Sequence, residues 1–409
     1  MTSPSHTLPS RRVAYATAAG AVLFTAMVVL FPRSAFEASL DGLRLWFEVV
    51  LPSLLPFFVM AQVLMGLGAV HFLGVCLEPL MRPLFRLPGT AAFAVAMGLV
   101  SGYPLGAKVT GDLRRHRLCS RVEAERLVAF ANTADPLFMS GAVAVGMFGQ
   151  ASLGAVLSFA HYASVVLVGL LMRFHGHREP PPPAPPPGAL LDRALEALYQ
   201  ARARDGRPFG HLLGDVVRDS MIQMLFIGGT IMLFSVLLRV AAITGLVPWA
   251  AQHLLGPLLS LVGLDPSLAH ALAAGLFELD LGSRAAAQAA ASLQDRVVIT
   301  SAVIAWSGLA VHAQVAAMLQ GTGCRLGPYI LARFLHGILA GLLTLLAFRV
   351  AGNLFLEAAL PLPAPLTPGF LGRLWGASLR VMGVTLTLLA TSLLWQLLRA
   401  GARRGRRRR

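Results

Sequence analysis

Long apolar segments alternate with short polar stretches along the 409-residue chain, and most of them are long enough to cross a membrane. A bilayer core about 30 Å thick needs about 20 apolar residues for each crossing helix. The pattern therefore predicts a polytopic α-helical membrane protein. The apolar segments run over Val13–Phe31, Leu45–Val70, Ala91–Val109, Ala124–Phe148, Leu153–Met172, Ser220–Leu246, Ala269–Ala291, Val297–Leu319, Tyr329–Phe348 and Leu374–Leu398.

A Pro-rich stretch divides this pattern into two halves. Within Arg173–Pro208, the run PPPPAPPPG favours polyproline II and the charged run LLDRALEALYQARARDGR follows it, so we expect a solvent linker. A second Pro-rich run, PLPAPLTPG, separates the last apolar segment from the others. The predicted units are a membrane half at 1–172, a cytoplasmic linker at 173–210, a second membrane half at 211–350, a Pro-rich loop with the last span at 351–398, and a basic tail at 399–409.

Composition agrees with a membrane protein and excludes other classes. The chain is 56% hydrophobic and only 13% charged, whereas soluble domains carry roughly 25% charged residues. The net charge of +15 comes mostly from arginines in short loops and in the tail, where they set topology, and no nucleic-acid motif accompanies them. Cys76, Cys119 and Cys324 are odd in number and lack CxxC spacing, which argues against a disulfide framework and against zinc. The first apolar segment has no clear cleavage site and is predicted to be an uncleaved span.

Arginine placement predicts the orientation of the chain. Arg11 and Arg12 precede the first span and the basic tail follows the last, so both termini are expected in the cytoplasm. The loop RRHRLCSR and the arginines upstream of Ala91–Val109 then share the cytoplasmic side, so this segment must enter and return as a re-entrant hairpin broken at SGYP. The same reasoning places both ends of Ala269–Ala291 outside, with a break at ELDLGSR.

The two halves resemble each other around these breaks. GLVSGYPLGAK begins at Gly98 and GLFELDLGSR at Gly275; each opens with Gly-Leu and passes through a glycine to a cation, Lys108 or Arg284. Further along, each half has an apolar helix with a polar interruption, FANTADP in the first and WSGLAVHAQ in the second. We therefore predict an inverted repeat with two re-entrant helical hairpins and discontinuous transmembrane helices, an architecture that binds substrate near the bilayer midplane.

These motifs resemble a known family. SGYPLGAK, EAERLVAFANTADPLFMSGAVAVGMFG, GLFELDLGS, SGLAVHAQV and YILARFLHGIL occur in order, and together they are similar to the YlbJ (SpoVV) family of sporulation integral membrane proteins, within the nucleoside-transporter/FeoB Gate-domain superfamily. The resemblance covers roughly 40–348, whereas the long PPPPAPPPG linker and the arginine tail depart from it. It implies a multi-pass protein of the cell membrane of a spore-forming bacterium, in the outer forespore membrane, that moves dipicolinic acid out of the mother cell.

Dipicolinate is a planar dianion, and the broken helices offer groups that suit an anion. Helix N-termini carry unpaired N–H groups and roughly half a positive charge, and glycines at the breaks let the backbone approach a ligand closely. No cofactor, metal or catalytic residue is predicted. The candidate substrate-binding residues are Ser101, Gly102, Tyr103, Gly106, Lys108, Asn132, Thr133, Glu278, Asp280, Gly282, Ser283, Arg284, Ser307, His312 and Gln314.

Charged candidates at the breaks have two interpretations each. Lys108, the only lysine, contacts the substrate anion, or its side chain snorkels to the cytoplasmic interface as an anchor. Glu278 and Asp280 couple transport to a proton or cation, or they pair with Arg284 as structure.

The polar residues in the interrupted helices also have two interpretations each. Asn132, Thr133 and Asp135 line a cavity, or they satisfy backbone groups that Pro136 frees. His312 and Gln314 form interhelical hydrogen bonds, or they contact the ligand. Arg333 and His336, at i and i+3 on one helical face, are expected to bind a lipid headgroup or to pack locally near the inner interface.

Other functions fit the sequence less well. No HExxH, GxSxG or Walker A motif is present, so an enzyme is not predicted. Iron permeation would favour thiolates in the path, and no cysteine lies in a hairpin break. A Gate-domain transporter of nucleosides or other small anions and a non-transporting sporulation scaffold are the alternatives. The expected partners are the anionic substrate and membrane lipid, with no nucleic acid, and a homo-oligomer is left open.

Overall fold

The structure is a computed structural model that describes residues 11–176 and 189–357, and within these residues every regular element is a helix. The predicted all-α class is therefore confirmed. The central part of the Pro-rich linker, the predicted last span and the basic tail lie outside the described residues.

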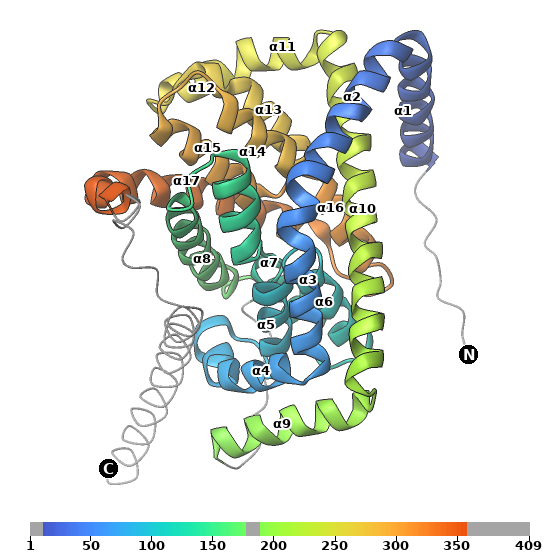
Figure 1. The fold of residues 1–409 in the computed structure, drawn as a ribbon, viewed down its shortest axis with the longest axis vertical. Coiled ribbons are helices and arrows are strands. Elements are labelled where there is room, and N and C mark those ends of the chain that lie inside the picture. The colour runs from blue at the N-terminus through green and yellow to red at the C-terminus, as the bar shows by residue number, and fades with distance from the viewer. Residues whose placement is uncertain (1–10, 177–188, 358–409) are drawn as a thin grey trace.

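A first helix leads into a series of helices that forms the first half of the molecule (Figure 1). This helix, α1 (Arg11–Leu30), meets the next at a bend of 101°, where Pro32 starts the new helix. The series that follows is α2 (Pro32–Leu45), η1 (Trp46–Val50), α3 (Leu51–Gly66), α4 (Ala69–Leu80), η2 (Met81–Phe85), α5 (Ala91–Ser101), α6 (Leu105–Arg115), α7 (Arg121–Ala131), the π-helical η3 (Phe138–Met147) and α8 (Leu153–Met172).

The second half repeats this order of elements. Its long first helix corresponds to α2 and α3, and its hairpin, its interrupted helix and its last helix follow in the same sequence as in the first half. The elements are α10 (Phe209–Ile243), α11 (Leu246–Ala250), η4 (Ala251–Leu255), α12 (Gly256–Leu261), η5 (Pro266–Leu268), α13 (Ala269–Phe277), α14 (Leu279–Gln288), α15 (Leu293–Trp306), α16 (Gly308–Met318) and α17 (Leu326–Glu357). The predicted inverted repeat is thus present in the described residues.

Both re-entrant segments form helical hairpins, α5–α6 in the first half and α13–α14 in the second. The two ends of the first lie together, since the Thr90 hydroxyl donates to the Leu118 carbonyl at 3.5 Å. The ends of the second also meet, because the Asp265 amide donates to the Asp295 carboxylate at 3.3 Å. A segment that crossed the membrane once could not bring its ends together in this way.

Glycines allow the first hairpin to pack closely against α7 and the arms of the second hairpin to pack closely against each other. A Cβ on Gly98 would lie 1.7 Å from the Ala131 carbonyl oxygen, and one on Gly106 would lie 2.0 Å from the same oxygen. In the second hairpin, a Cβ on Gly282 would lie 2.3 Å from the Cα of Gly275. Small residues serve helix packing in membranes because backbones that approach closely gain van der Waals contact. The repeated Gly-Leu motifs therefore mark helix contacts.

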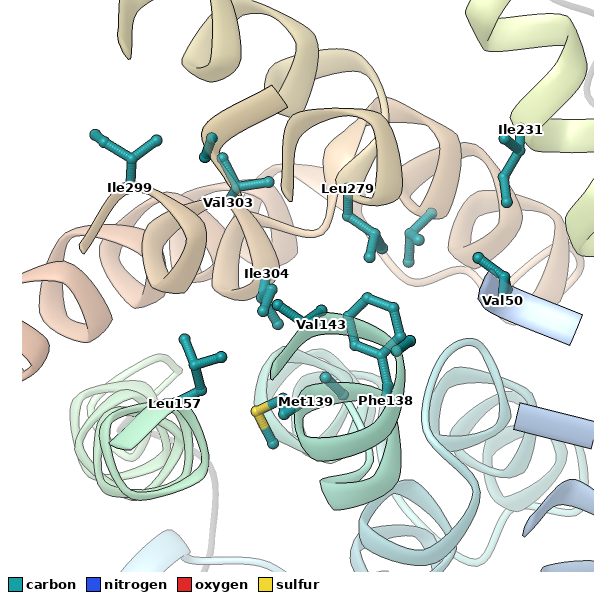
Figure 2. Packing of buried hydrophobic residues seen from close by; sticks show 14 of the residues in the cluster. Val50, Phe138, Met139, Val143, Leu157, Ile231, Leu279, Ile299, Val303 and Ile304 are labelled. Carbon is teal, nitrogen blue, oxygen red and sulfur yellow. The ribbon is translucent and has the colours of Figure 1, made fainter. Parts of the chain in front are cut away.

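The core joins the two halves around η3 (Figure 2). Phe138, Met139 and Val143 on η3 are buried against residues of α15 and α14, among them Ile304 and Leu279. Residues of α3, α8 and α10 belong to the same cluster. The interrupted helix of the first half is thereby enclosed by the second half.

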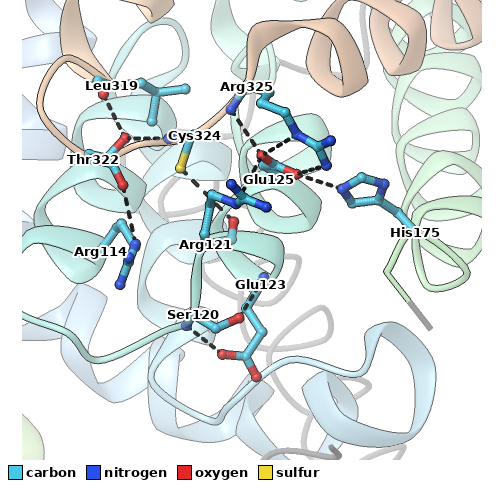
Figure 3. A network of polar contacts seen from close by, with 10 residues as sticks. All are labelled: Arg114, Ser120, Arg121, Glu123, Glu125, His175, Leu319, Thr322, Cys324 and Arg325. Atoms are coloured by element: carbon cyan, nitrogen blue, oxygen red, sulfur yellow. Dashed lines mark hydrogen bonds and ion pairs between the residues drawn. The ribbon is translucent and has the colours of Figure 1, made fainter. Parts of the chain in front are cut away.

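Polar contacts tie two loops of different halves together, among them the hydrogen bond that Arg114 Nε donates to the Thr322 carbonyl at 3.3 Å (Figure 3). The guanidinium of Arg115 donates to the carbonyls of Met318 and Gln320, each at 3.1 Å. Close by, the fully buried carboxylate of Glu125 accepts hydrogen bonds from Arg325 at 3.1 Å. The loop before α7 and the loop before α17 therefore lie on the same side of the molecule, where the arginine pattern places both.

Two elements differ from the sequence prediction. The predicted solvent linker contains a helix, α9 (Leu190–Asp205), which packs along α4 and pairs Arg193 with Glu78. α10 starts at Phe209, well before the predicted Ser220, because its first turns are amphipathic and bury Leu212 against α3. By length and composition, four helices of the described residues can cross a membrane, or up to six if each of two bent pairs is one span.

Cysteine labelling in sealed vesicles tests this topology. In a chain without its native cysteines, single cysteines at Asp265 and Asp295 should both react from outside, since the two residues are in contact. A cysteine at Arg117, in the loop before α7, should react only from the cytoplasmic side. Labelling of Asp265 and Asp295 from opposite sides would contradict the second re-entrant hairpin.

Candidate functional site

The interruptions of both repeats meet at one small cavity of about 60 Å³. Ligand pockets typically measure roughly 300–1,000 Å³, so this space is smaller than a typical ligand pocket. α3 and α10 form an apolar wall on one side, and the two hairpin breaks and both interrupted helices form the other. The lining residues are Leu54, Phe58, Tyr103, Ala134, Asp135, Phe138, Ile227, Thr230, Ile231, Glu278, Leu279, Asp280, Ala310, Val311 and Gln314.

Tyr103 and Asp135 are the polar residues that the first repeat contributes to the lining of this cavity. Asp135 accepts from the amides of Leu137 at 3.0 Å and Phe138 at 2.8 Å, so it caps the helix that resumes after the break. Gly102 has a φ of +69° and packs against this carboxylate, where a Cβ would come within 2.6 Å. The tip of the first hairpin is thus held against the break in the α7–η3 helix.

Ser101 lies beside this cavity and Gly106 lies away from it. Ser101 is buried and lines a smaller adjoining space of about 10 Å³ together with Asp135. Gly106 faces the Ala131 carbonyl, and Gly282 in the other hairpin faces its opposite arm, so these two glycines serve helix packing.

Glu278 and Asp280 are the acidic residues that the second repeat contributes to the lining of the cavity. Glu278 accepts from the Leu281 amide at 2.7 Å and so caps α14. Asp280 is 5% exposed, and its Oδ1 has no hydrogen-bond partner. Arg284 is partly exposed and forms no ion pair with either carboxylate, so the interpretation of Glu278 and Asp280 as its structural partners is wrong.

Asn132 and Thr133 belong to a buried polar cluster near Tyr103, whose hydroxyl accepts from Arg333. Asn132 donates to the Tyr329 hydroxyl at 3.1 Å, and Thr133 contacts His161 Nε2 at 2.7 Å. Both are fully buried, and neither lines the cavity. Their partners here are side chains and not backbone groups freed by Pro136, whereas Asp135 both lines the cavity and accepts from backbone amides.

The interruption of the second repeat is built by Ser307, which has a φ of +71° and stands between α15 and α16. The imidazole of His312 contacts the Gly308 carbonyl at 2.6 Å and packs on Trp306, with ring centroids 4.3 Å apart. His312 does not line the cavity, whereas Gln314 does. The hydroxyl of buried Ser283, on α14, has no partner.

Cations are arranged differently from the sequence prediction. Lys108 is exposed and lies outside the cavity, because it stands on the outer face of α6, which favours its interpretation as an interfacial anchor. Arg333 and His336, expected to contact lipid headgroups or to pack locally, are fully buried. Lipid contact at these two residues is therefore wrong, since both side chains are packed inside the bundle.

Sequence reasoning missed the apolar wall of the cavity and the position of Arg333. Leu54, Phe58, Ile227 and Ile231 belong to long apolar helices in which nothing distinguishes one face from another. Arg333 did carry a signal, since an ionisable residue inside an apolar span usually faces the bundle interior.

The sequence is similar to those of known proteins. A family model described as Gate, nucleoside recognition, matches residues 47–163. An uncharacterized protein of Alkalihalophilus pseudofirmus is 32% identical over 171 residues, which is 40% of this chain and 35% of that protein.

Solved structures show a more distant similarity. An intermediate state of CNTnw has a TM-score of 0.46 at 15% identity, covering 85% of this chain and 88% of the other. An inward-facing substrate-bound state of CNTnw has a TM-score of 0.42 at 16% identity, covering 83% and 87%.

A curated relative covers far more of the sequence. The sporulation integral membrane protein YlbJ of Bacillus subtilis is 44% identical over 331 residues, which is 80% of this chain and 81% of that protein. The relative therefore matches most of the length of both chains at 44% identity. The chain is therefore an integral membrane protein that belongs to the YlbJ family of sporulation proteins.

Proposed function

We propose that this protein is a transporter of sporulation that moves dipicolinic acid, a small dicarboxylate, from the mother cell across the outer forespore membrane. The observation that carries the proposal is the cavity where the breaks of both repeats meet. Broken helices in an inverted repeat are typical of a transport site near the bilayer midplane. A sporulation scaffold would have no need of such a cavity with carboxylates at its wall.

Helix N-termini give the cavity a partial affinity for anions. α16 starts at Gly308, and Ala310 and Val311 in its first turn line the cavity. The first amides of a helix lack intrahelical acceptors and carry partial positive charge. Asp135 already accepts from the Leu137 and Phe138 amides and Glu278 caps α14, whereas no side chain caps α16. The start of α16 is therefore where a substrate carboxylate would bind.

The same cavity contains the carboxylates of Asp135, Glu278 and Asp280. Two like charges in a dry site cannot both remain ionised without a compensating cation. A dicarboxylate would therefore enter together with protons or another cation. This supports the interpretation of Glu278 and Asp280 as the coupling residues.

These carboxylates also favour a second candidate. A carboxylate accepts hydrogen bonds from hydroxyl and amino groups, which a neutral nucleoside offers in abundance. The family model that matches residues 47–163 is described as nucleoside recognition. Nucleoside transport is therefore the alternative to be tested beside dicarboxylate transport.

Flux measurements in proteoliposomes separate these candidates. Vesicles that contain the full chain should take up labelled dipicolinate, excess unlabelled dipicolinate should block this uptake, and excess uridine should leave it unchanged. Empty vesicles are the control. Uptake of uridine without uptake of dipicolinate would favour the second candidate, and uptake of neither would favour a scaffold.

A further inference from the structure

Arg333 is a buried cation without a carboxylate partner. Its side chain lies inside the bundle on α17 and is fully buried. The guanidinium donates to the Asn132 carbonyl at 3.1 Å and to the Tyr103 hydroxyl, and its Nε has no acceptor. Among the residues that the structure describes, no Asp or Glu forms an ion pair with it.

Such a charge is expensive to bury. Taking a guanidinium out of water costs several kcal/mol even after relaxation, and a partner of opposite charge usually offsets this cost. The end of α7 at Asn132 supplies part of the offset, because a helix C-terminus carries roughly half a negative charge. The polar side chains around the guanidinium are the tyrosines Tyr103 and Tyr329 and the histidines His161, His312 and His336. The positive charge of Arg333 is therefore only partly offset, and an anion beside it would complete the compensation.

Tyr103 contacts both this cation and the cavity. Its ring packs on the guanidinium, with Cζ of Arg333 5.3 Å from the ring centroid, and the same residue lines the cavity. The Tyr103 hydroxyl donates to the Ile304 carbonyl at 3.0 Å, at the end of α15. Because Tyr103 follows Gly102 at the tip of a hairpin, a rotation of this one side chain would expose Arg333 to the cavity.

We propose that Arg333 is the residue that recognises a carboxylate of the substrate, and that Tyr103 covers it while the site is empty. The inference rests on the proposed dicarboxylate transport and assigns to Arg333 the role that the sequence suggested for Lys108. The fork of a guanidinium matches the two oxygens of a carboxylate. The substrate replaces the Tyr103 hydroxyl as the acceptor of the guanidinium. A neutral ligand would not form this charge-assisted pair with Arg333.

Ligand-dependent thermal stabilisation of the purified full chain tests this assignment. The ligands are dipicolinate and its neutral analogue pyridine-2,6-dicarboxamide. Arg333→Gln should weaken dipicolinate binding by about ten- to a hundredfold, the value of a hydrogen bond to a charged group. Binding of the dicarboxamide should change much less. Arg333→Lys should keep the preference for the dicarboxylate, and Tyr103→Phe should tighten dipicolinate binding because it frees the guanidinium donor.

Arg349→Gln is the matched control, since Arg349 is an exposed arginine on the same helix. An equal loss of both ligands in Arg333→Gln would assign Arg333 a structural role only and overturn the proposal. If the Gln variant does not fold, the Lys and Phe variants decide: loss of anion preference in the first, or no tightening in the second, overturns it.

The test also separates this inference from the proposed function. If the wild type binds other small carboxylates but not dipicolinate, the proposed substrate is wrong, and the same variants tested with those carboxylates decide the role of Arg333. If the wild type binds no carboxylate at all, both proposals fail.

Discussion

Gly98→Ala should prevent the first hairpin from packing against α7 and lower the unfolding temperature of the purified protein sharply. The added methyl group would lie 1.7 Å from the Ala131 carbonyl oxygen, a backbone atom that no side-chain rotation can move. Overpacking a tight contact typically costs about 1–3 kcal/mol and occasionally more, and we expect about 3 kcal/mol here. The gain in helix propensity from glycine to alanine, about 1 kcal/mol, does not compensate.

Gly214→Ala is the matched control for this prediction. Gly214 also lies within a helix, α10, but nothing comes within 4 Å of a Cβ placed on it. This variant should be as stable as the wild type or slightly more stable, because only the propensity term remains. Thermal unfolding in detergent compares the two variants. A wild-type midpoint for Gly98→Ala would mean that the first hairpin lies further from α7.

The hairpins could be predicted because their signals are local. Glycine, proline and charged residues interrupt otherwise apolar runs at Gly102 and at Glu278, and each interruption ends a helix in the structure. The arginine pattern then decided whether a segment crosses or returns, which no local propensity can do. The breaks at Asn132 and Ser307 follow the same logic, since polar residues interrupt an apolar helix there.

The lining of the cavity could not be predicted in the same way, because it depends on which helix face meets which neighbour. Lys108 and Arg333 are both single cations in apolar surroundings, yet the first is exposed and the second fully buried. The difference comes from tertiary packing: α17 is packed against α7, α8 and α15, whereas Lys108 stands on the outer face of its hairpin. The apolar wall that contains Leu54 and Ile231 is likewise produced by tertiary packing.

The linker shows a further limit of reasoning from composition. Its charged run predicts solvent exposure, but α9 buries Leu190 and Ala194 and packs along α4. One helical face with few apolar residues is enough for such docking when a partner surface is available. Composition averages over both faces of the helix and therefore misses it.

Asp280→Asn should uncouple transport from its driving gradient. The Asp280 carboxylate is buried at the cavity, and its Oδ1 has no partner, so it is free to bind the proton or cation that accompanies a dicarboxylate. Asparagine has nearly the same shape but neither binds a proton at this site nor carries a negative charge. Exchange of labelled for unlabelled dipicolinate should persist, whereas accumulation against a concentration difference should be lost.

The measurement is uptake into proteoliposomes with an imposed pH gradient, an imposed sodium gradient or neither. Each coupled proton contributes about 1.4 kcal/mol, or about tenfold in accumulation, per unit of pH difference. The wild type should show this gain under one of the gradients, and Asp280→Asn should not. Asp219→Asn, at an exposed position on α10, is the control and should accumulate substrate like the wild type. Gradient-driven accumulation by the Asp280 variant at the wild-type level would move the coupling site elsewhere, with Glu278 and Asp135 as the remaining carboxylates of the cavity.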